Sequence, residues 1–278
     1  MRLAPVVLFF LCLAIPLSSS GGDIPENFRP ENLVAWCIVP FDAKKRGPVE
    51  RAEMLAEIGM KRCAYDWRKE HIPEFEEEIL QYGKNGVEFT AFWNRHDEAF
   101  RLFEKHGIRP QIWITNPSPK GGNEEEKIAA AVAKLKPVAE QAASAGCVVG
   151  LYNHGGWGGE PGNLVAVCRE LRKAGFGKTG IIYNFHHAHD RIETFSEDLE
   201  RMKPYLLCVN LNGMMTTPDP KILPIGEGEH EAQMIRHLAG HYRGPVGILD
   251  HRKDVDAKEA LQVNLRGLQK ILGETGEE

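Results

Sequence analysis

The stretch IIYNFHHAHD, Ile181 to Asp190, begins as an apolar strand-like segment and ends in three histidines and an aspartate. One interpretation is a polar loop that happens to be rich in histidine. The other is that the end of a buried strand opens into a metal-binding or proton-transfer site. The two interpretations make different demands on the rest of the chain, because a site needs further polar residues brought to the same place.

Seven more short apolar segments resemble this one, and longer amphipathic segments alternate with them. The predicted strands are residues 33–39, 61–66, 87–93, 109–115, 147–152, 180–185, 205–211 and 245–249. Eight βα repeats in a chain of 278 residues are typical of an α/β fold of one domain, the (β/α)₈ TIM barrel. The alternative is a doubly wound sheet, which usually carries GxGxxG after its first strand. The segment VPFDAKKRG (39–47) has no such motif.

Proline and glycine mark the expected helix boundaries. First helical positions are predicted at Pro48 and Pro73, and helix ends just before Gly59, Gly107 and Gly175. The longest predicted helix is 124–145, with a kink expected at Pro137, and the last is 256–272.

The N-terminus predicts export. Arg2 precedes the apolar run LAPVVLFFLCLAIPL and the small residues SSSGG, a pattern typical of a secretory signal peptide. We expect residues 1–22 to be removed and residues 23–278 to form the barrel domain in the periplasm or outside the cell. No stable membrane insertion is expected after cleavage; a retained N-terminal anchor is the alternative. The net charge of -5 and the lack of a basic run argue against nucleic acid as a partner.

The cysteines predict neither a disulfide framework nor a zinc knuckle. Without Cys12, which lies in the signal peptide, an odd number remains, so not all can pair within one chain. No CxxC motif occurs. Most of these cysteines lie in apolar strand-like runs, which indicates small buried hydrophobic residues.

In a TIM barrel the active site lies at the C-terminal ends of the strands. Here those ends and the loops after them are rich in asparagine and tryptophan, which suit a polyhydroxylated ligand because amides both donate and accept hydrogen bonds and indoles offer an apolar face. We therefore expect a small sugar or polyol to bind there, although strand ends are often polar and asparagine suits turns. The candidate substrate-binding residues are Trp67, Trp93, Asn94, Asn153, Trp157, Asn184, Asn210 and Asn212.

Histidines and loop carboxylates are the candidates for chemistry. His154 follows a strand end directly and precedes the glycines of GGWGG, which permit close backbone approach or unusual dihedral angles. A neutral imidazole is both a general base and a common metal ligand. The candidate catalytic residues are His154, His187, Glu160 and Glu227, and the candidate metal ligands are His154, His187 and His189.

Four motifs together resemble the xylose isomerase-like TIM barrel superfamily, which includes sugar and sugar-phosphate isomerases and epimerases, inosose dehydratases and hydroxypyruvate isomerases. They are GLYNHGG (150–156), GIIYNFHHAHD (180–190), LLCVNLNG (206–213) and PIGEGEHEAQMI (224–235). With its predicted signal peptide and these asparagines, the chain resembles an exported bacterial subgroup of this superfamily. The resemblance implies a divalent metal held by glutamate, aspartate, histidine and glutamate from strands five to eight. It also aligns His187 with a recurring histidine after strand six.

The sequence departs from that metal quartet. Asn153 and His154 stand where the first glutamate would be, and Asn184 stands in place of the aspartate. Asn210 and Asn212 stand in place of a histidine and a lysine of strand seven, and the glutamate of strand eight falls near Leu249, next to Asp250. Neutral amides in place of carboxylates weaken a site for a hard divalent cation.

Two functions remain open. One is an isomerase, epimerase or lyase that acts on a sugar or polyol by proton transfer next to a carbonyl. The other is a carbohydrate-binding or accessory protein without catalysis on the same scaffold. A retaining glycosidase is less well supported, because it needs two carboxylates about 5 Å apart and the predicted end of strand four, ITNPSP, carries no acid.

Overall fold

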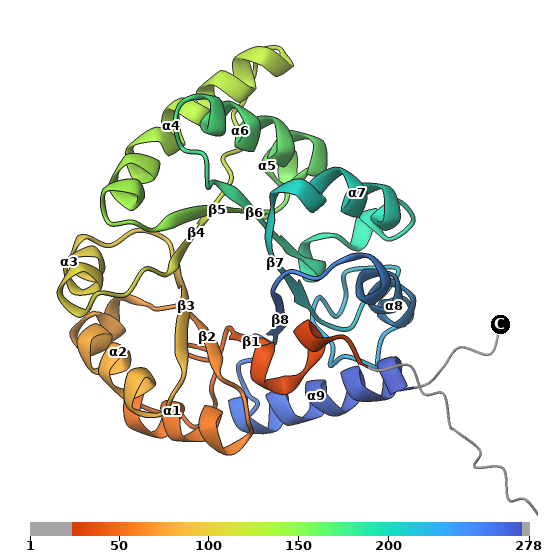
Figure 1. Ribbon diagram of the computed structural model, residues 1–278. Coiled ribbons are helices and arrows are strands. Elements are labelled where there is room, and N and C mark those ends of the chain that lie inside the picture. Colours follow the sequence, from red (N-terminus) through yellow and green to blue (C-terminus); the bar gives the residue numbers. More distant parts are fainter. Residues whose placement is uncertain (1–23, 274–278) are drawn as a thin grey trace, which may run out of the picture.

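Eight parallel strands close into a barrel in the computed structural model, which describes residues 24–273. Each strand pairs with its neighbours in chain order and β8 pairs with β1, while the helices form an outer ring (Figure 1). The strands are β1 (Val34–Trp36), β2 (Arg62–Tyr65), β3 (Glu88–Trp93), β4 (Gln111–Thr115), β5 (Val148–Tyr152), β6 (Gly180–Asn184), β7 (Leu206–Leu211) and β8 (Val246–Leu249). The predicted single-domain TIM barrel is confirmed. Residues 1–23, with the predicted signal peptide, lie outside the described residues.

The helices follow the strands as the sequence predicts. They are α1 (Pro48–Glu57), α2 (Phe75–Lys84), α3 (Asp97–His106), α4 (Glu124–Ser144), α5 (Gly156–Gly159), α6 (Pro161–Lys173), α7 (Phe195–Met202), α8 (Glu231–His241) and α9 (Ala257–Gly273). Pro48 opens α1 as expected. Pro73 does not open α2; it lies inside a 3₁₀ helix that ends one residue before α2 begins. The longest helix, α4, continues through Pro137.

The first strand is shorter than predicted for a local reason. Cys37 has φ 65°, so the chain leaves the extended conformation directly after Trp36. The bend starts the loop that carries Phe41 to the C-terminal mouth of the barrel. A left-handed conformation at a residue other than glycine costs energy, and this one lies beside the cavity described below.

Two layers of apolar side chains stabilise the fold. The larger lies between the strands and the helices, and the smaller fills the barrel interior around Trp36, Trp113 and Ile182. The rings of Trp36 and Trp113 meet edge to face, with centroids 4.9 Å apart. The cysteines of the described chain are all free and buried, which confirms their predicted role as small hydrophobic residues.

A buried carboxylate fixes the long connection between β7 and α8. Glu231, at the start of α8, accepts backbone N–H groups of Gly226 at 2.9 Å, Gly228 at 2.8 Å and Met214 at 3.0 Å. These bonds satisfy the carboxylate, which is 1% exposed, and hold residues 213–230 over the barrel mouth. Among residues 24–273 there is no helix with the length and apolar character that a membrane span requires.

Candidate active site at the C-terminal mouth of the barrel

A cavity of about 190 Å³ opens at the C-terminal ends of the strands. Its walls come from the ends of several strands and from the connection after β7, the arrangement expected of a TIM-barrel active site. The lining residues are Trp36, Cys37, Phe41, Asp66, Arg68, Trp93, Tyr152, His154, His186, His187, Lys221 and His251.

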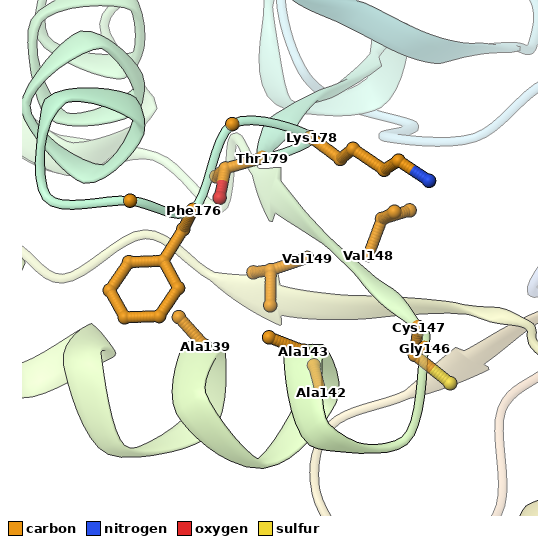
Figure 2. A pocket seen from close by; sticks show the side chains of 12 residues that line it. Ala139, Ala142, Ala143, Gly146, Cys147, Val148, Val149, Phe176, Lys178 and Thr179 are labelled. Carbon is orange, nitrogen blue, oxygen red and sulfur yellow. The ribbon is translucent and has the colours of Figure 1, made fainter.

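A second cavity, of about 230 Å³, lies at the other end of β5 and β6 (Figure 2). It is bordered by apolar residues such as Ala139, Val149 and Phe176, with Lys178 at its edge. Cys147 and Lys178 are the titratable residues in its lining, so it offers less for acid–base chemistry than the cavity at the C-terminal mouth.

Four histidines gather in the C-terminal cavity. Ring centroids are 3.7 Å apart for His186 and His187, 4.4 Å for His154 and His187, and 5.2 Å for His186 and His251. His186 is buried, whereas His154 is exposed at the mouth. The histidines that sequence analysis singled out, His154 and His187, therefore do share one cavity.

Burial and a nearby ammonium keep these imidazoles neutral. Burial, followed by Lys221, lowers the pKa of His187 to about 2, and the same two causes lower the pKa of His154. The Nζ atom of Lys221 lies 3.3 Å from Nδ1 of His187. An ammonium has only hydrogens to offer, so Nδ1 accepts and the ring proton of His187 sits on Nε2. His187 is thus a neutral imidazole in the cavity wall whose Nε2–H is a hydrogen-bond donor.

Asp66, at the end of β2, is the carboxyl group of this cavity. Its side chain is 2% exposed, and burial raises its pKa to about 7 even though Arg68 acts in the opposite direction. Oδ1 accepts the backbone N–H of Val39 at 3.3 Å, while Oδ2 has no hydrogen-bond partner in the protein. A carboxyl group that titrates near neutrality suits general acid–base chemistry.

Three predicted substrate-binding asparagines bond to one another instead. Oδ1 of Asn153 accepts from the side chain of Asn184 at 2.7 Å, and Oδ1 of Asn184 accepts from the side chain of Asn210 at 2.7 Å. All three are buried, and none lines the cavity. The prediction that Asn184 and Asn210 lie at the same mouth as His154 and His187 is confirmed, but the expectation that all four share one cavity is wrong.

Of the other predicted substrate-binding residues, one lines the cavity and four do not. Trp93 lines the cavity with its ring 4.8 Å from that of Tyr152. Trp67 instead donates to the carbonyl of Trp93 at 2.7 Å, and Trp157 donates to Glu124 at 2.7 Å. Asn94 is exposed and accepts the N–H of its neighbour, and Asn212 is buried and donates to the carbonyl of Gly213. These four residues do not line the cavity.

Both predicted catalytic glutamates lie outside the cavity. Glu160 precedes α6 and pairs with Arg191 at 3.1 Å. Glu227 is exposed. The buried acid of GEGEHE is Glu231, which is occupied by backbone N–H groups. Residue type alone misled the prediction here, because an irregular connection has no fixed periodicity that shows which of its acids faces inward.

The predicted metal ligands do not fit a divalent cation. His189 has Nδ1 2.9 Å from the carbonyl of Met215 and Nε2 3.2 Å from the carbonyl of Lys221, so both nitrogens face protein acceptors. The Lys221 ammonium faces Nδ1 of His187, where a ligand lone pair would be needed. No group of three or more histidine, cysteine, aspartate or glutamate residues within 24–273 is placed to hold a metal ion.

Several cavity residues were not among the predicted site residues. Asp66 ends the predicted strand 61–66 and His251 comes two residues after the predicted strand 245–249, so their position alone could have identified them. Trp36 and Tyr152 lie within strands and face the barrel interior, where Trp36 donates to the Tyr152 hydroxyl at 3.2 Å. Lys221 had no sequence signal, because it reaches the cavity from a long irregular connection.

Comparison with solved structures supports the fold assignment. The IolI protein, crystallised with a zinc atom, matches with a TM-score of 0.66 and 11% identity over 88% of this chain and 99% of its own. The 3-keto-D-glucoside 4-epimerase YcjR from E. coli matches with a TM-score of 0.62 and 15% identity, over 86% of this chain and 98% of its own. A xylose isomerase domain containing protein from Salmonella typhimurium matches with a TM-score of 0.65 and 12% identity, over 88% of this chain and 98% of its own. No protein-family model and no curated protein matches the sequence. The chain therefore shares the TIM-barrel fold of these proteins.

Proposed function

We propose that the protein is an exported enzyme that isomerises or epimerises a sugar or polyol, or eliminates water from it, by moving a proton next to a carbonyl. The observation that carries this proposal is Asp66, a buried carboxyl group with a pKa of about 7 at the C-terminal mouth. The similarity in fold to a 3-keto-D-glucoside 4-epimerase supports the substrate class.

The cavity supplies the parts that such a reaction needs. Deprotonated Asp66 removes the proton from the carbon next to the carbonyl, and the electron pair moves onto the carbonyl oxygen. The Nε2–H of His187 donates to the resulting oxyanion and stabilises it. Return of the proton to the other face of the same carbon gives an epimer. Return to the neighbouring carbon after enediol formation gives an isomer, and loss of a β-hydroxyl as water gives an elimination product.

Aromatic residues provide the binding surface. Trp36, Trp93 and Tyr152 surround the cavity, with ring centroids 4.8–6.2 Å apart. Their faces suit the C–H groups of a sugar ring. The IolI protein carries zinc, but the donor set of this chain does not match a hard divalent site, so the proposed steps use the chain's own groups.

Proton exchange with solvent tests this proposal. Aldoses, ketoses and sugar acids are incubated with the protein in D₂O, and loss of the C–H signal next to the carbonyl is followed by ¹H NMR. We expect exchange with at least one sugar class. Asp66→Asn should abolish it and Glu227→Gln, which changes an exposed acid outside the cavity, should leave it intact.

The same experiment separates catalysis from binding. A non-catalytic carbohydrate-binding protein is the second candidate, because Asp66 is the one carboxyl group among the described residues that lines the cavity. Saturable sugar binding with no deuterium incorporation, and equal binding by Asp66→Asn, would favour it and overturn the enzymatic proposal.

Export is a separate part of the proposal. It is supported by Arg2 and the apolar run that ends in SSSGG. N-terminal sequencing of protein from its native host should give a start near Gly21 or Gly22. An intact Met1 on cytoplasmic protein would contradict it.

A further inference from the structure

Two cationic side chains line the C-terminal cavity without an anionic partner. Lys221 donates to His187, and Nη1 of Arg68 donates to the backbone carbonyls of Asp66 at 3.1 Å and Trp67 at 2.8 Å. Neither cation forms an ion pair with a carboxylate among residues 24–273. Two other arginines that follow strands at this mouth are paired: Arg46 with Asp42 at 2.9 Å and with Asp256 at 2.7 Å, and Arg252 with Asp250 at 2.7 Å.

The remaining titratable groups do not balance this charge. The four imidazoles are neutral, so they add none. Asp66 is the facing carboxyl group, and with a pKa of about 7 it is only partly ionised at neutral pH. Lys221 also contributes to the lowered pKa values of His154 and His187, as a positive potential inside the cavity requires.

Two buried polar atoms in the cavity wall have no partner in the protein. They are Oδ2 of Asp66 and Nδ1 of His186, on side chains that are 2% and 4% exposed. Leaving such a group without a hydrogen bond costs about 1–3 kcal/mol. Functional sites accept that cost when a ligand later provides the partner.

We propose that the substrate of this cavity is an anionic sugar, with a carboxylate or a phosphate group held by Lys221 and Arg68. The inference rests on the proposed function and specifies its substrate class. Charge-assisted hydrogen bonds from an ammonium and a guanidinium are the usual means of holding both groups, and a neutral sugar would leave both cations unpaired in a half-enclosed site.

The anion subsite is tested first with small probes. Inorganic phosphate and acetate are titrated while tryptophan fluorescence is recorded, because Trp36 and Trp93 lie in the cavity wall. We expect saturable binding of at least one probe to the wild type. Lys221→Gln and Arg68→Gln should each weaken it about tenfold or more, the scale of one charge-assisted hydrogen bond. Lys178→Gln is the matched control, since Lys178 is an exposed loop lysine beside the cavity at the opposite end (Figure 2).

Calorimetry with glucose, glucuronate and glucose 6-phosphate then gives the source of the anion. A carboxylate site prefers glucuronate, a phosphate site prefers glucose 6-phosphate, and either preference should weaken in Lys221→Gln and in 0.5 M NaCl. If the small probes give no saturable signal, or bind equally well to both cavity variants, the anion subsite is overturned. Tight binding of neutral sugars in that case leaves the proposed sugar chemistry standing. If anion binding depends on Lys221 but no sugar exchanges deuterium in D₂O, the anion subsite stands and the proposed sugar chemistry is overturned.

Discussion

The carboxyl group of Asp66 and the guanidinium of Arg68 lie two residues apart in the chain and line the same cavity. Burial favours the protonated form of Asp66, and the positive charge of Arg68 favours the ionised form. The balance leaves the pKa at about 7, where a small change in environment alters the fraction of active base. The dependence of the reaction on pH therefore reports on this pair directly.

We expect solvent exchange to rise with pH through an inflection near 7, because Asp66 must be ionised to accept a proton. Arg68→Gln should move the inflection to higher pH, since it removes the charge that lowers the pKa of Asp66. The rate of deuterium incorporation at saturating sugar, measured from pH 5 to 9, gives both profiles. An unchanged inflection in Arg68→Gln would contradict this assignment.

His186 and His187 show how neighbouring residues of one type differ in role. Their rings lie 3.7 Å apart and both line the cavity, yet His187 is half-buried while His186 is buried. Two of the histidines in this stretch thus line a cavity, as a site requires. The predicted metal ligand His189 does not point into that cavity, because both of its nitrogens face carbonyls of the β7–α8 connection.

His187→Ala should lower kcat/KM by about 10²-fold, the scale for a group that takes part in proton transfer or oxyanion stabilisation. Its melting temperature should change little. His186→Ala should have a smaller effect on kcat/KM but lower the melting temperature, because it removes a buried ring from packed surroundings. If His187→Ala and the wild type have the same kcat/KM, the histidines of residues 186–189 have a structural role and no role in the reaction.

At the scale of elements, the ends of the strands were predictable but the direction of their side chains was not. The short apolar runs and the proline and glycine residues around them located all eight strands to within a few residues. The interlocked asparagines after β5, β6 and β7 could not be distinguished from ligand-facing ones, because the sequence does not show which amides bond across strands. Gly247 illustrates the point: a Cβ there would lie 2.0 Å from Oδ1 of Asn210, so a glycine on β8 makes room for that side chain.

The same interlocking predicts the response to metal removal. Since Asn153, Asn184 and Asn210 are bonded to one another, the Oδ1 atoms of Asn153 and Asn184 already accept N–H donors and are poorly placed to bind a hard cation. Dialysis against EDTA should leave solvent exchange and melting temperature unchanged, and elemental analysis should give far less than one metal per chain. Activity lost on dialysis and restored by Zn²⁺ would show that the histidines rearrange to bind metal.

The GGWGG segment was expected to allow close backbone approach, and Gly158 shows it. A Cβ on this residue would lie 2.3 Å from the carbonyl oxygen of Asn116 and 2.6 Å from that of Pro117. Asn116 also donates to the carbonyl of Gly158 at 2.9 Å, which joins α5 to the end of β4. The loop after β5 is therefore fixed in place, and it follows directly on His154.

Gly158→Ala should destabilise the protein by about 1–3 kcal/mol, the usual cost of adding a carbon where there is no space. Gly177→Ala is the matched control, because no atom lies within 4 Å of the Cβ position there. Chemical denaturation of both variants measures the difference. Equal stability would mean that the loop after β5 can move away from Asn116 freely.

Across the whole molecule, stability depends on pH through the groups buried at the barrel mouth. In the unfolded chain a histidine has a pKa of about 6.5, whereas burial lowers the pKa of His154, His186, His187 and His251 in the folded protein. Below pH 6.5 the unfolded chain therefore binds more protons, and the free energy of unfolding falls as the pH falls. Asp66 has the opposite effect on the free energy of unfolding. Folding raises its pKa, so between pH 7 and about 4 the folded chain binds its proton more tightly and the free energy of unfolding rises as the pH falls. One carboxyl group offsets only part of the contribution of four histidines.

We accordingly expect the free energy of unfolding to decrease between pH 7 and pH 5, by at most about 1.4 kcal/mol per pH unit for each strongly shifted histidine. The double variant His186→Gln, His187→Gln removes the two most strongly shifted imidazoles, so its stability should depend less on pH in this range. His241→Gln, at an exposed position on α8, should keep the slope of the wild type. Urea denaturation at half-unit pH intervals measures all three slopes. Parallel slopes for the wild type and the double variant would show that the barrel-mouth histidines titrate alike in the folded and unfolded chain, and would remove the basis for treating them as neutral hydrogen-bond donors.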